Sequence, residues 1–297
     1  MMPAAFLPRA ARRVRHEIAA VRHAVAFGRA ADGPVSAAAM FAAGLAYATP
    51  RRWAGLALAW LGIRRLRLSP GRLGGGALWV NPRDGGHLCI VEEFFVPPLA
   101  CDLSLVTFTP ALILDCGGHI GAFTLIARQR FSSVPITVFE PNPDNVEWLR
   151  ANLAANHAAD VSITVAAVST YAGRGAFGFT PTRSEAGRLE PLGPRADLAE
   201  RVEVAVVDLA ELVRRLAPAS LLLKVDIEGE EERLIPVLIS VLPQECAVFF
   251  ETHRGRDGWD AVSAVLSAHM FAVRLLRQHG DFYDGFAIRS PDREVSR

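Results

Sequence analysis

Charged side chains and a histidine with the properties of a catalytic centre lie late in the chain. Lys224, Asp226 and Glu228 alternate with other residues. In an extended strand Lys224 and Asp226 project to one side, and Glu228 continues that side if the extension persists. Glu251 and His253 repeat this spacing at the end of the next predicted strand. Because a positioned carboxylate or imidazole can remove a proton from a reacting group, we expect these five residues to be catalytic.

A glycine-rich turn lies earlier in the chain, after an apolar run. Glycines let the backbone turn tightly and let a ligand approach the following helix. The next apolar run ends in Glu140, where a carboxylate can accept hydrogen bonds from both hydroxyls of a ribose. Together these features predict an adenosine site. The turn itself consists of Asp115, Gly117, Gly118, His119 and Gly121.

The spacing within this turn separates the classes of nucleotide-binding protein. A dinucleotide fold requires GxGxxG, whereas this turn has the form Asp-x-Gly-x-x-x-Gly, which argues against a dehydrogenase. The chain also lacks a GxxxxGK[ST] loop, which argues against ATP or GTP hydrolysis. Asp115 at the start of the turn would repel a phosphate and attract the ammonium group of a methionine-type tail.

The roles within the catalytic group follow from residue type. Lys224 is the only lysine in the chain, which indicates that a compact ammonium group is needed to balance charge at this position. We assign Asp226 the position nearest the cofactor and either Glu228 or His253 the role of base. A structural ion-pair network is the alternative. A divalent metal shared by Asp226, Glu228 and Glu251 is also conceivable, but no metal-ligand motif requires one and we predict none.

The elements that position these residues alternate between strand and helix from Ala111 onward, which predicts a doubly wound, mostly parallel α/β sheet. We expect strands at 112–114, 136–139, 162–165, 202–206, 221–227 and 247–250. We expect helices ending near 130 and 153 and at 208–216, 230–240 and 258–268. Two short strands, 77–80 and 87–91, are predicted around a turn. Residues 178–200, with three prolines, interrupt the alternation where a substrate lid or cap can sit.

Residues 1–72 form a separate basic segment. They hold twelve Arg against Glu17 and Asp32, a net charge of 12 − 2 = +10, whereas the whole chain carries +1. Pro50 divides their apolar stretch into pieces too short to cross a bilayer. Gly71–Gly76 mark a break. We predict a helical extension over 1–72 that either packs on the core or makes peripheral contact with an anionic membrane.

Composition bounds the remaining possibilities. About half of the residues are apolar, so the chain can bury a large core. Arginines interrupt the apolar run at the N-terminus, which argues against a signal peptide. The cysteines show neither CxxC pairing nor a short secreted framework, so we expect reduced thiols and a cytoplasmic protein. The acidic core has no basic, aromatic-interleaved groove, so we expect no nucleic-acid partner.

Six sequence blocks occur in order over residues 111–253, and the series resembles the FkbM-type methyltransferases. The blocks are ILDCGGHIGAFTL, VFEPNPDNVEWLRANLAAN, VAAVST, VDLAEL, LLKVDIEGEE and FFETH. The resemblance implies a class I methyltransferase (Rossmann-like) fold with an antiparallel pair at the C-terminal edge of its sheet. Because the glycine-rich break ends near residue 76, we place this domain at 73–297. It also implies S-adenosylmethionine as cofactor and a hydroxyl acceptor on a sugar, glycolipid or secondary metabolite. A non-catalytic scaffold that only binds the adenosine cofactor is the alternative.

The cofactor residues carry over by position in these blocks. Gly118 and His119 depart from the family pattern, which more often has Ala and then Asn. His119 either bonds the methionine tail or is a partly exposed turn residue. The resemblance implies cofactor contacts for Asp115, Gly117, Gly121, Glu140, Ala167, Val168 and Asp226. We also expect cofactor contacts for Gly118, His119 and Asn142, which lie within the same blocks.

Overall fold

The large sheet is built from the strands that the sequence predicts after Ala111, together with a C-terminal hairpin. The computed structural model describes residues 21–48, 64–181, 183–189 and 199–290. Within them, the seven-stranded sheet has the order β12-β13-β11-β10-β3-β4-β5. In chain order its strands are β3 (Leu112–Cys116), β4 (Ile136–Phe139), β5 (Ser162–Thr164), β10 (Ser220–Val225), β11 (Glu245–Thr252), β12 (Ala272–His279) and β13 (Phe282–Arg289).

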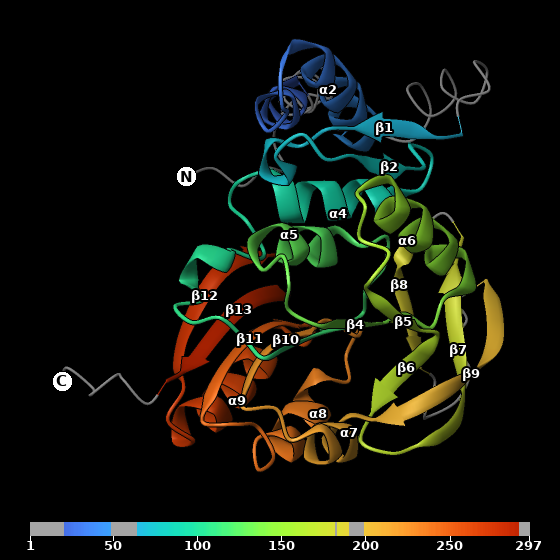
Figure 1. Cartoon of the computed structure of the whole chain (residues 1–297). Helices are drawn as coiled ribbons and strands as arrows, with labels where there is room; N and C mark the ends of the chain where they lie inside the picture. The colour runs from blue at the N-terminus through green and yellow to red at the C-terminus, as the bar shows by residue number, and fades with distance from the viewer. Residues whose placement is uncertain (1–20, 49–63, 182, 190–198, 291–297) are drawn as a thin grey trace, which may run out of the picture.

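Strand direction confirms the predicted fold class. Strands β11, β10, β3, β4 and β5 are parallel, whereas β13 is antiparallel to both β11 and β12. This is the mostly parallel sheet with an antiparallel C-terminal edge pair that the resemblance implied (Figure 1). The carboxyl ends of the parallel strands meet at one edge, where a doubly wound fold binds its ligand.

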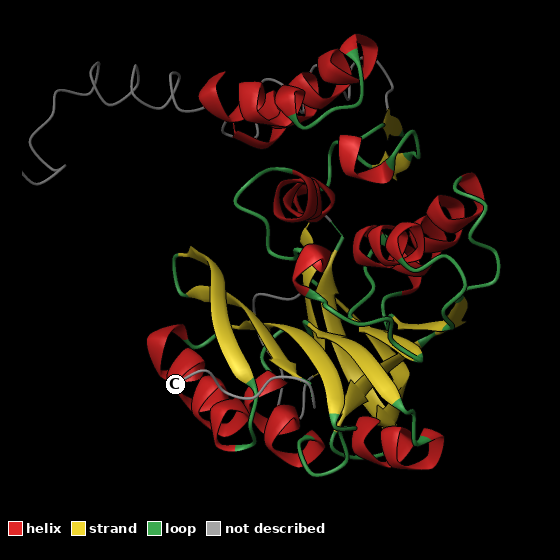
Figure 2. Ribbon diagram, turned by 60° about the vertical axis from the view of Figure 1, so that its left-hand side comes forward, coloured by secondary structure: helices red, strands yellow, loops and turns green. Residues whose placement is uncertain are grey.

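Helices cover both faces of the sheet (Figure 2). Leu222 in β10 packs in one hydrophobic cluster with Phe123, whereas Leu221 and Leu223 pack in another with Leu234. Because successive side chains of a strand point to opposite faces, both sides of β10 must be apolar. One layer contains α4 (Gly85–Phe95), α5 (Ala122–Arg130) and α6 (Pro143–Ala155), and the other contains α7 (Leu209–Leu216), α8 (Glu231–Leu238) and α9 (Gly255–Ala268).

A second, four-stranded sheet has the order β6-β9-β7-β8. The strand predicted at 202–206 is part of β9, and β9 pairs with β6 and β7 in this second sheet rather than joining the large one. In the segment where a substrate lid or cap was predicted to sit, residues 178–180 and 183–189 belong to an antiparallel hairpin of β7 and β8. Residues 190–198 of that segment lie outside the described residues. The bounds are β6 (Ala166–Ser169), β7 (Gly173–Thr180), β8 (Arg183–Leu189) and β9 (Glu200–Asp208).

The prediction of a strand at 87–91 is wrong, because these residues belong to α4. Asp84 caps this helix by accepting a hydrogen bond from the backbone nitrogen of Gly86 at 2.9 Å. Leu88, Val91 and Phe95 lie at helical spacing and are buried. The hydrophobic periodicity of so short an apolar run does not distinguish a strand from a helix. The N-cap and the packing therefore determine that these residues form a helix.

The N-terminal residues share the hydrophobic core of the sheet. Phe27 and Met40 are fully buried in the same cluster as Phe123, and Met40 lies in α2 (Pro34–Ala48). Strand β1 (Leu66–Leu68) pairs with β2 (Leu78–Val80), so the two strands lie on either side of residue 72 in the sequence. The boundary between the N-terminal extension and the methyltransferase domain at residue 72 stays a prediction.

The predicted membrane contact of residues 1–72 also stays a prediction. Pro50, which divides the apolar stretch, and the arginines before residue 21 lie outside the described residues. No described helix is long and apolar enough to cross a membrane.

Candidate functional site

A cavity of about 270 Å³ opens at the carboxyl ends of the strands and collects residues from both sheets. Residues of the glycine turn, of β6 and of the loop after β10 line it. Asp115, Gly118, Gly121, Asn142 and Lys224 are buried outside its lining. The sequence-predicted residues that line it are Gly117, His119, Glu140, Ala167, Val168, Asp226, Glu228, Glu251 and His253.

The glycine turn passes close to the end of β10. Gly117 and Gly121 have φ angles of 85° and 91°, a region that favours glycine. A Cβ atom at Gly117 would lie 1.9 Å from the backbone oxygen of Asp226, so no other residue fits without moving the backbone. The turn therefore depends on glycine for its conformation and for its contact with β10.

Glu140 extends a buried carboxylate to the cavity wall. Its Oε2 accepts a hydrogen bond of 2.7 Å from the backbone nitrogen of His119, and its Oε1 accepts one of 2.9 Å from that of Asn142. Burial raises the pKa of Glu140 to about 7, although these hydrogen bonds oppose the rise. A carboxyl group held this firmly can accept hydroxyl groups with its remaining lone pairs.

The two asparagines after Glu140 have different positions. Asn142 is the N-cap of α6 and accepts a hydrogen bond from the backbone nitrogen of Asp144, so its side chain organises the helix start rather than the cavity wall. Asn145, which the sequence analysis missed, lines the cavity and donates to Glu140 at 3.3 Å. Its position one turn into the helix that follows Glu140 was the available signal.

Lys224 is enclosed by oxygen atoms behind the turn. Its Nζ donates a 2.8 Å hydrogen bond to the oxygen of Gly117 and lies 3.2 Å from Asp226 Oδ2 and 3.7 Å from Asp115 Oδ1. Burial by itself lowers the pKa of Lys224, but the two carboxylates outweigh burial and raise it overall. Burial likewise opposes ionisation of Asp226, and Lys224 and His253 outweigh it, so the pKa of Asp226 is lowered. Lys224 therefore lies where it can balance the charge of both carboxylates.

His119 is buried rather than partly exposed. Its backbone has a φ of 47°, and its Nε2 lies 2.9 Å from Ser184 Oγ of β8. Burial lowers the pKa of His119 well below its usual value, so the ring is neutral at pH 7. Its Nδ1 has no hydrogen-bond partner among the described residues. The histidine thus joins the glycine turn to the second sheet and leaves one nitrogen unused.

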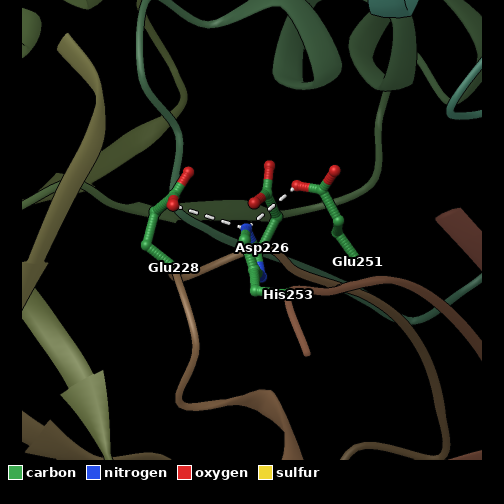
Figure 3. A group of neighbouring side chains, drawn as sticks. All are labelled: Asp226, Glu228, Glu251 and His253. Atoms are coloured by element: carbon green, nitrogen blue, oxygen red, sulfur yellow. Dashed lines mark ion pairs between the residues drawn. The ribbon is translucent and has the colours of Figure 1, made fainter. Parts of the chain in front are cut away.

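Asp226, Glu228, Glu251 and His253 form one cluster, and one ligand atom from each lies within 4.8 Å of the others (Figure 3). His253 Nε2 is 3.2 Å from Glu251 Oε2 and 3.4 Å from Glu228 Oε2. Burial raises the pKa of Glu251 well above its usual value and also raises that of Glu228. Burial opposes protonation of His253, but the surrounding carboxylates, Glu231 foremost, outweigh it and raise its pKa.

Glu228 reaches this cluster through a turn. The sequence predicted that Glu228 shares the side of Lys224 and Asp226 if the strand stays extended. Strand β10 ends at Val225, so the backbone does not stay extended as far as Glu228. Glu228 has a φ of 60°, a left-handed conformation that costs a residue with a side chain roughly 1 to 2 kcal/mol. The buried carboxylate of Glu231 accepts hydrogen bonds from the backbone nitrogens of Ile227 and Gly229 at 2.7 and 2.8 Å and holds the turn. Glu231 was not among the residues predicted from the sequence.

Five further lining residues come from parts of the chain that carry no motif. Tyr47 comes from α2, Cys89 and Glu93 from α4, and His279 and Phe282 from the C-terminal hairpin. Burial raises the pKa of Glu93 to about 8, although Arg277 opposes the rise. The spacing of these residues in the sequence does not indicate that they meet, because four separate elements bring them together.

Comparison with protein families identifies the chain. The model of the FkbM methyltransferase domain matches residues 115–283, which is more than half of the sequence. The chain belongs to the FkbM methyltransferase family. It is therefore a methyltransferase, and S-adenosylmethionine is its methyl donor. None of the curated proteins compared with this FkbM methyltransferase matches its sequence.

Several proteins of solved structure resemble this FkbM methyltransferase at low identity. Precorrin-6y C5,15-methyltransferase from Geobacter metallireducens GS-15 has a TM-score of 0.39 and 15% identity over 63% of this chain and 85% of its own. Ribosomal protein L11 methylase from Lactobacillus delbrueckii subsp. bulgaricus has a TM-score of 0.38 and 14% identity, over 63% of this chain and 74% of its own. TYW2 from M. jannaschii, in complex with AdoMet, has a TM-score of 0.41 and 8% identity, over 76% of this chain and 87% of its own.

The residues of this FkbM methyltransferase fit its cofactor. The Glu140 carboxylate can accept ribose hydroxyls, and Ala167 and Val168 offer apolar surface in the same cavity. Asp226 adds negative charge that suits a sulfonium and an ammonium group. Oδ1 of Asp115 is buried without a hydrogen bond among the described residues, next to the turn. This donor set suits a positively charged adenosine cofactor better than a phosphate.

Proposed function

We propose that this FkbM methyltransferase methylates a hydroxyl group of a small-molecule or glycan acceptor. The observation that carries the proposal is the position of Glu228 and His253 in the wall of the cavity that also contains Glu140 and Asp226. A hydroxyl is a weak acid and must lose its proton as it gains the methyl group. A basic group beside the cofactor pocket is therefore what this reaction requires.

Glu228 is the better candidate for the base. The two nitrogens of His253 face Glu231, Glu228 and Glu251, and the raised pKa keeps a proton on the ring. Glu228 lines the cavity with 24% of its side chain exposed, and burial raises its pKa toward the range in which a carboxylate accepts a proton effectively. His253 then holds Glu228 and Glu251 in position.

The cofactor supplies an electrophilic methyl group on a sulfonium, and the protein residues bind, align and exclude water. We assign Glu140 to the ribose hydroxyls and Ala167 and Val168 to the adenine. Alignment in a water-excluding cavity supplies much of the acceleration of an in-line displacement. The carboxylates of the cluster disfavour a phosphate-rich acceptor by repulsion, which supports the expectation of no nucleic-acid partner.

The decisive experiment is methyl transfer from labelled S-adenosylmethionine into fractionated cell extract, with the full chain. We expect label in a small-molecule or glycan fraction, at an oxygen atom identified by mass spectrometry and NMR of the product. Label on nitrogen or carbon would overturn the proposal. A chain that binds S-adenosylhomocysteine but transfers no label in any fraction would instead support the scaffold alternative.

A further inference from the structure

We propose that Asp226, Glu228, Glu251 and His253 bind one divalent cation of the Mg²⁺ or Mn²⁺ class in the wall of the cavity. The role of this cation in catalysis rests on the proposed methylation of a hydroxyl, whereas its binding does not. The four side chains point toward one another in Figure 3. Three carboxylates and one imidazole form an oxygen-rich donor set, which suits Mg²⁺ and Mn²⁺ better than the metals that prefer thiolates.

The spacing of the ligand atoms matches a cation of this size. One atom from each residue lies within 4.8 Å of the others. Ligands about 2.1 Å from a central Mg²⁺ lie at most about 4.2 Å apart across the metal. The cluster therefore needs only a small contraction to surround an ion. Glu251 lies in β11, and Asp226 directly follows the adjacent parallel strand β10, so the sheet keeps the two residues at a constant separation.

His253 provides an observation independent of the acidic residues. Its side chain is only 10% exposed, and neither ring nitrogen makes a hydrogen bond within the described residues. Nε2 nevertheless lies between oxygens of Glu251 and Glu228, too far off the hydrogen-bonding direction to donate to either. A buried imidazole without a hydrogen bond, aimed at carboxylate oxygens, has the arrangement of a metal ligand. A cation bound there would displace the ring proton that the carboxylates favour in its absence.

The electrostatic balance also favours a cation. The buried neighbourhood contains the carboxyl groups of Asp226, Glu228, Glu231 and Glu251. Lys224 lies 3.2 Å from Asp226 and donates its hydrogen bond to Gly117, so it compensates one side only. Crowded carboxylates that cannot all ionise together are what a divalent ion stabilises.

The turn after β10 holds one ligand in a constrained position. Glu228 has a left-handed φ of 60°, and Glu231 fixes the turn through the backbone nitrogens of Ile227 and Gly229. Backbone held in a sparsely populated conformation concentrates at functional sites. The four ligands all line the cavity, so an ion can enter and keep open positions toward it. An acceptor hydroxyl bound there would be acidified, and the second oxygen of Glu228 would take its proton.

Binding is tested with Mn²⁺ on the full chain after treatment with a chelator and dialysis, by following the electron paramagnetic resonance signal of free Mn²⁺. We expect saturable binding of one ion per chain, with competition by Mg²⁺. Glu251→Gln and His253→Gln should each weaken it at least about tenfold, since even residues behind a metal ligand have effects of this size. Glu232→Gln is the matched control, because Glu232 lies on α8 outside the cluster and the cavity lining.

Two further measurements keep the result decisive. Affinity for S-adenosylhomocysteine reports whether each variant is folded. If both variants lose affinity for S-adenosylhomocysteine, the test is made on the unmodified chain by NMR. Mn²⁺ should then broaden the signals of the His253 ring protons at lower concentrations than those of the other histidines. Non-saturable binding, variants that bind like the unmodified chain, or an unaffected His253 signal overturns the metal site. Mn²⁺ binding at the cluster without hydroxyl methylation overturns the proposed function and leaves the site standing.

Discussion

Lys224 Nζ donates a 2.8 Å hydrogen bond to the backbone oxygen of Gly117, and this contact joins the end of β10 to the turn that follows β3. The two residues are 107 positions apart in the chain. Because Lys224 also lies beside Asp115 and Asp226, one ammonium group links the glycine turn to the cluster of Asp226, Glu228, Glu251 and His253.

Replacing this lysine should destabilise the fold. Lys224→Met leaves Asp115 and Asp226 buried without their cation, and breaking a buried pair from one side costs about 3 to 5 kcal/mol. Urea denaturation measures the free energy of unfolding. Arg233→Met is the control, because that side chain is 55% exposed, pairs with Glu230, and should contribute at most about 1 kcal/mol. A Lys224→Met variant as stable as the control would contradict this account.

Cofactor affinity should depend on Glu140 and on its ionisation. Glu140→Ala should weaken S-adenosylhomocysteine binding by roughly 1 to 3 kcal/mol, the scale for an unpaired buried polar group, whereas Glu147→Ala on the exposed side of α6 should not. The pKa of Glu140 is raised to about 7, so its carboxyl group takes up a proton as the pH falls through that value. A protonated carboxyl accepts hydroxyl groups less well.

The affinity of the unmodified chain should therefore decrease as the pH falls through about 7 and level off above it. Isothermal titration calorimetry at several pH values on both sides of 7 measures this. The Glu140→Ala variant should show a flatter profile. Equal pH profiles for the two proteins would remove Glu140 from the ribose site.

Glu228 should affect turnover more than cofactor binding. Glu228→Gln keeps the size of the side chain but removes the proton acceptor, and a general base commonly contributes about 10²- to 10⁴-fold. We expect turnover to decrease within this range while affinity for S-adenosylhomocysteine stays nearly constant. Glu203→Gln, in an exposed pair with Arg174 on the second sheet, provides the control. Full activity of Glu228→Gln would show that this carboxylate is structural.

The N-terminal residues should contribute to stability. Phe27 is fully buried in the main hydrophobic cluster, so Phe27→Ala should reduce the free energy of unfolding by about 3 to 5 kcal/mol. Val35 is 86% exposed, and Val35→Ala should change it by no more than about 0.5 kcal/mol. A chain that begins at Leu73 lacks Phe27 and Met40. The apolar surface that these residues cover would then face water, so this shortened chain should precipitate. A soluble truncated chain that still binds cofactor would favour the alternative in which residues 1–72 make peripheral contact with a membrane.

The sequence by itself predicted the elements and residues whose signals are local. Strand ends, a glycine turn and the acid at the end of the next strand are read from a few adjacent residues, which is why β3, β4, β10 and β11 were placed correctly. Glu251 and His253 were assigned to the catalytic group on the same basis. The strand predicted at 87–91 failed because five residues contain too little periodicity, and the cap at Asp84 and burial against α5 select a helix.

Only the tertiary structure decided how these parts meet. It paired β9 with β6 and β7 in a second sheet, and placed Tyr47 and Phe282, far apart in the chain, in one cavity wall. It also brought Glu228 to His253 through a left-handed turn held by Glu231, although β10 ends three residues earlier. Contacts between distant segments depend on packing and on buried hydrogen bonds across the whole core, and no local pattern of residue types records that geometry.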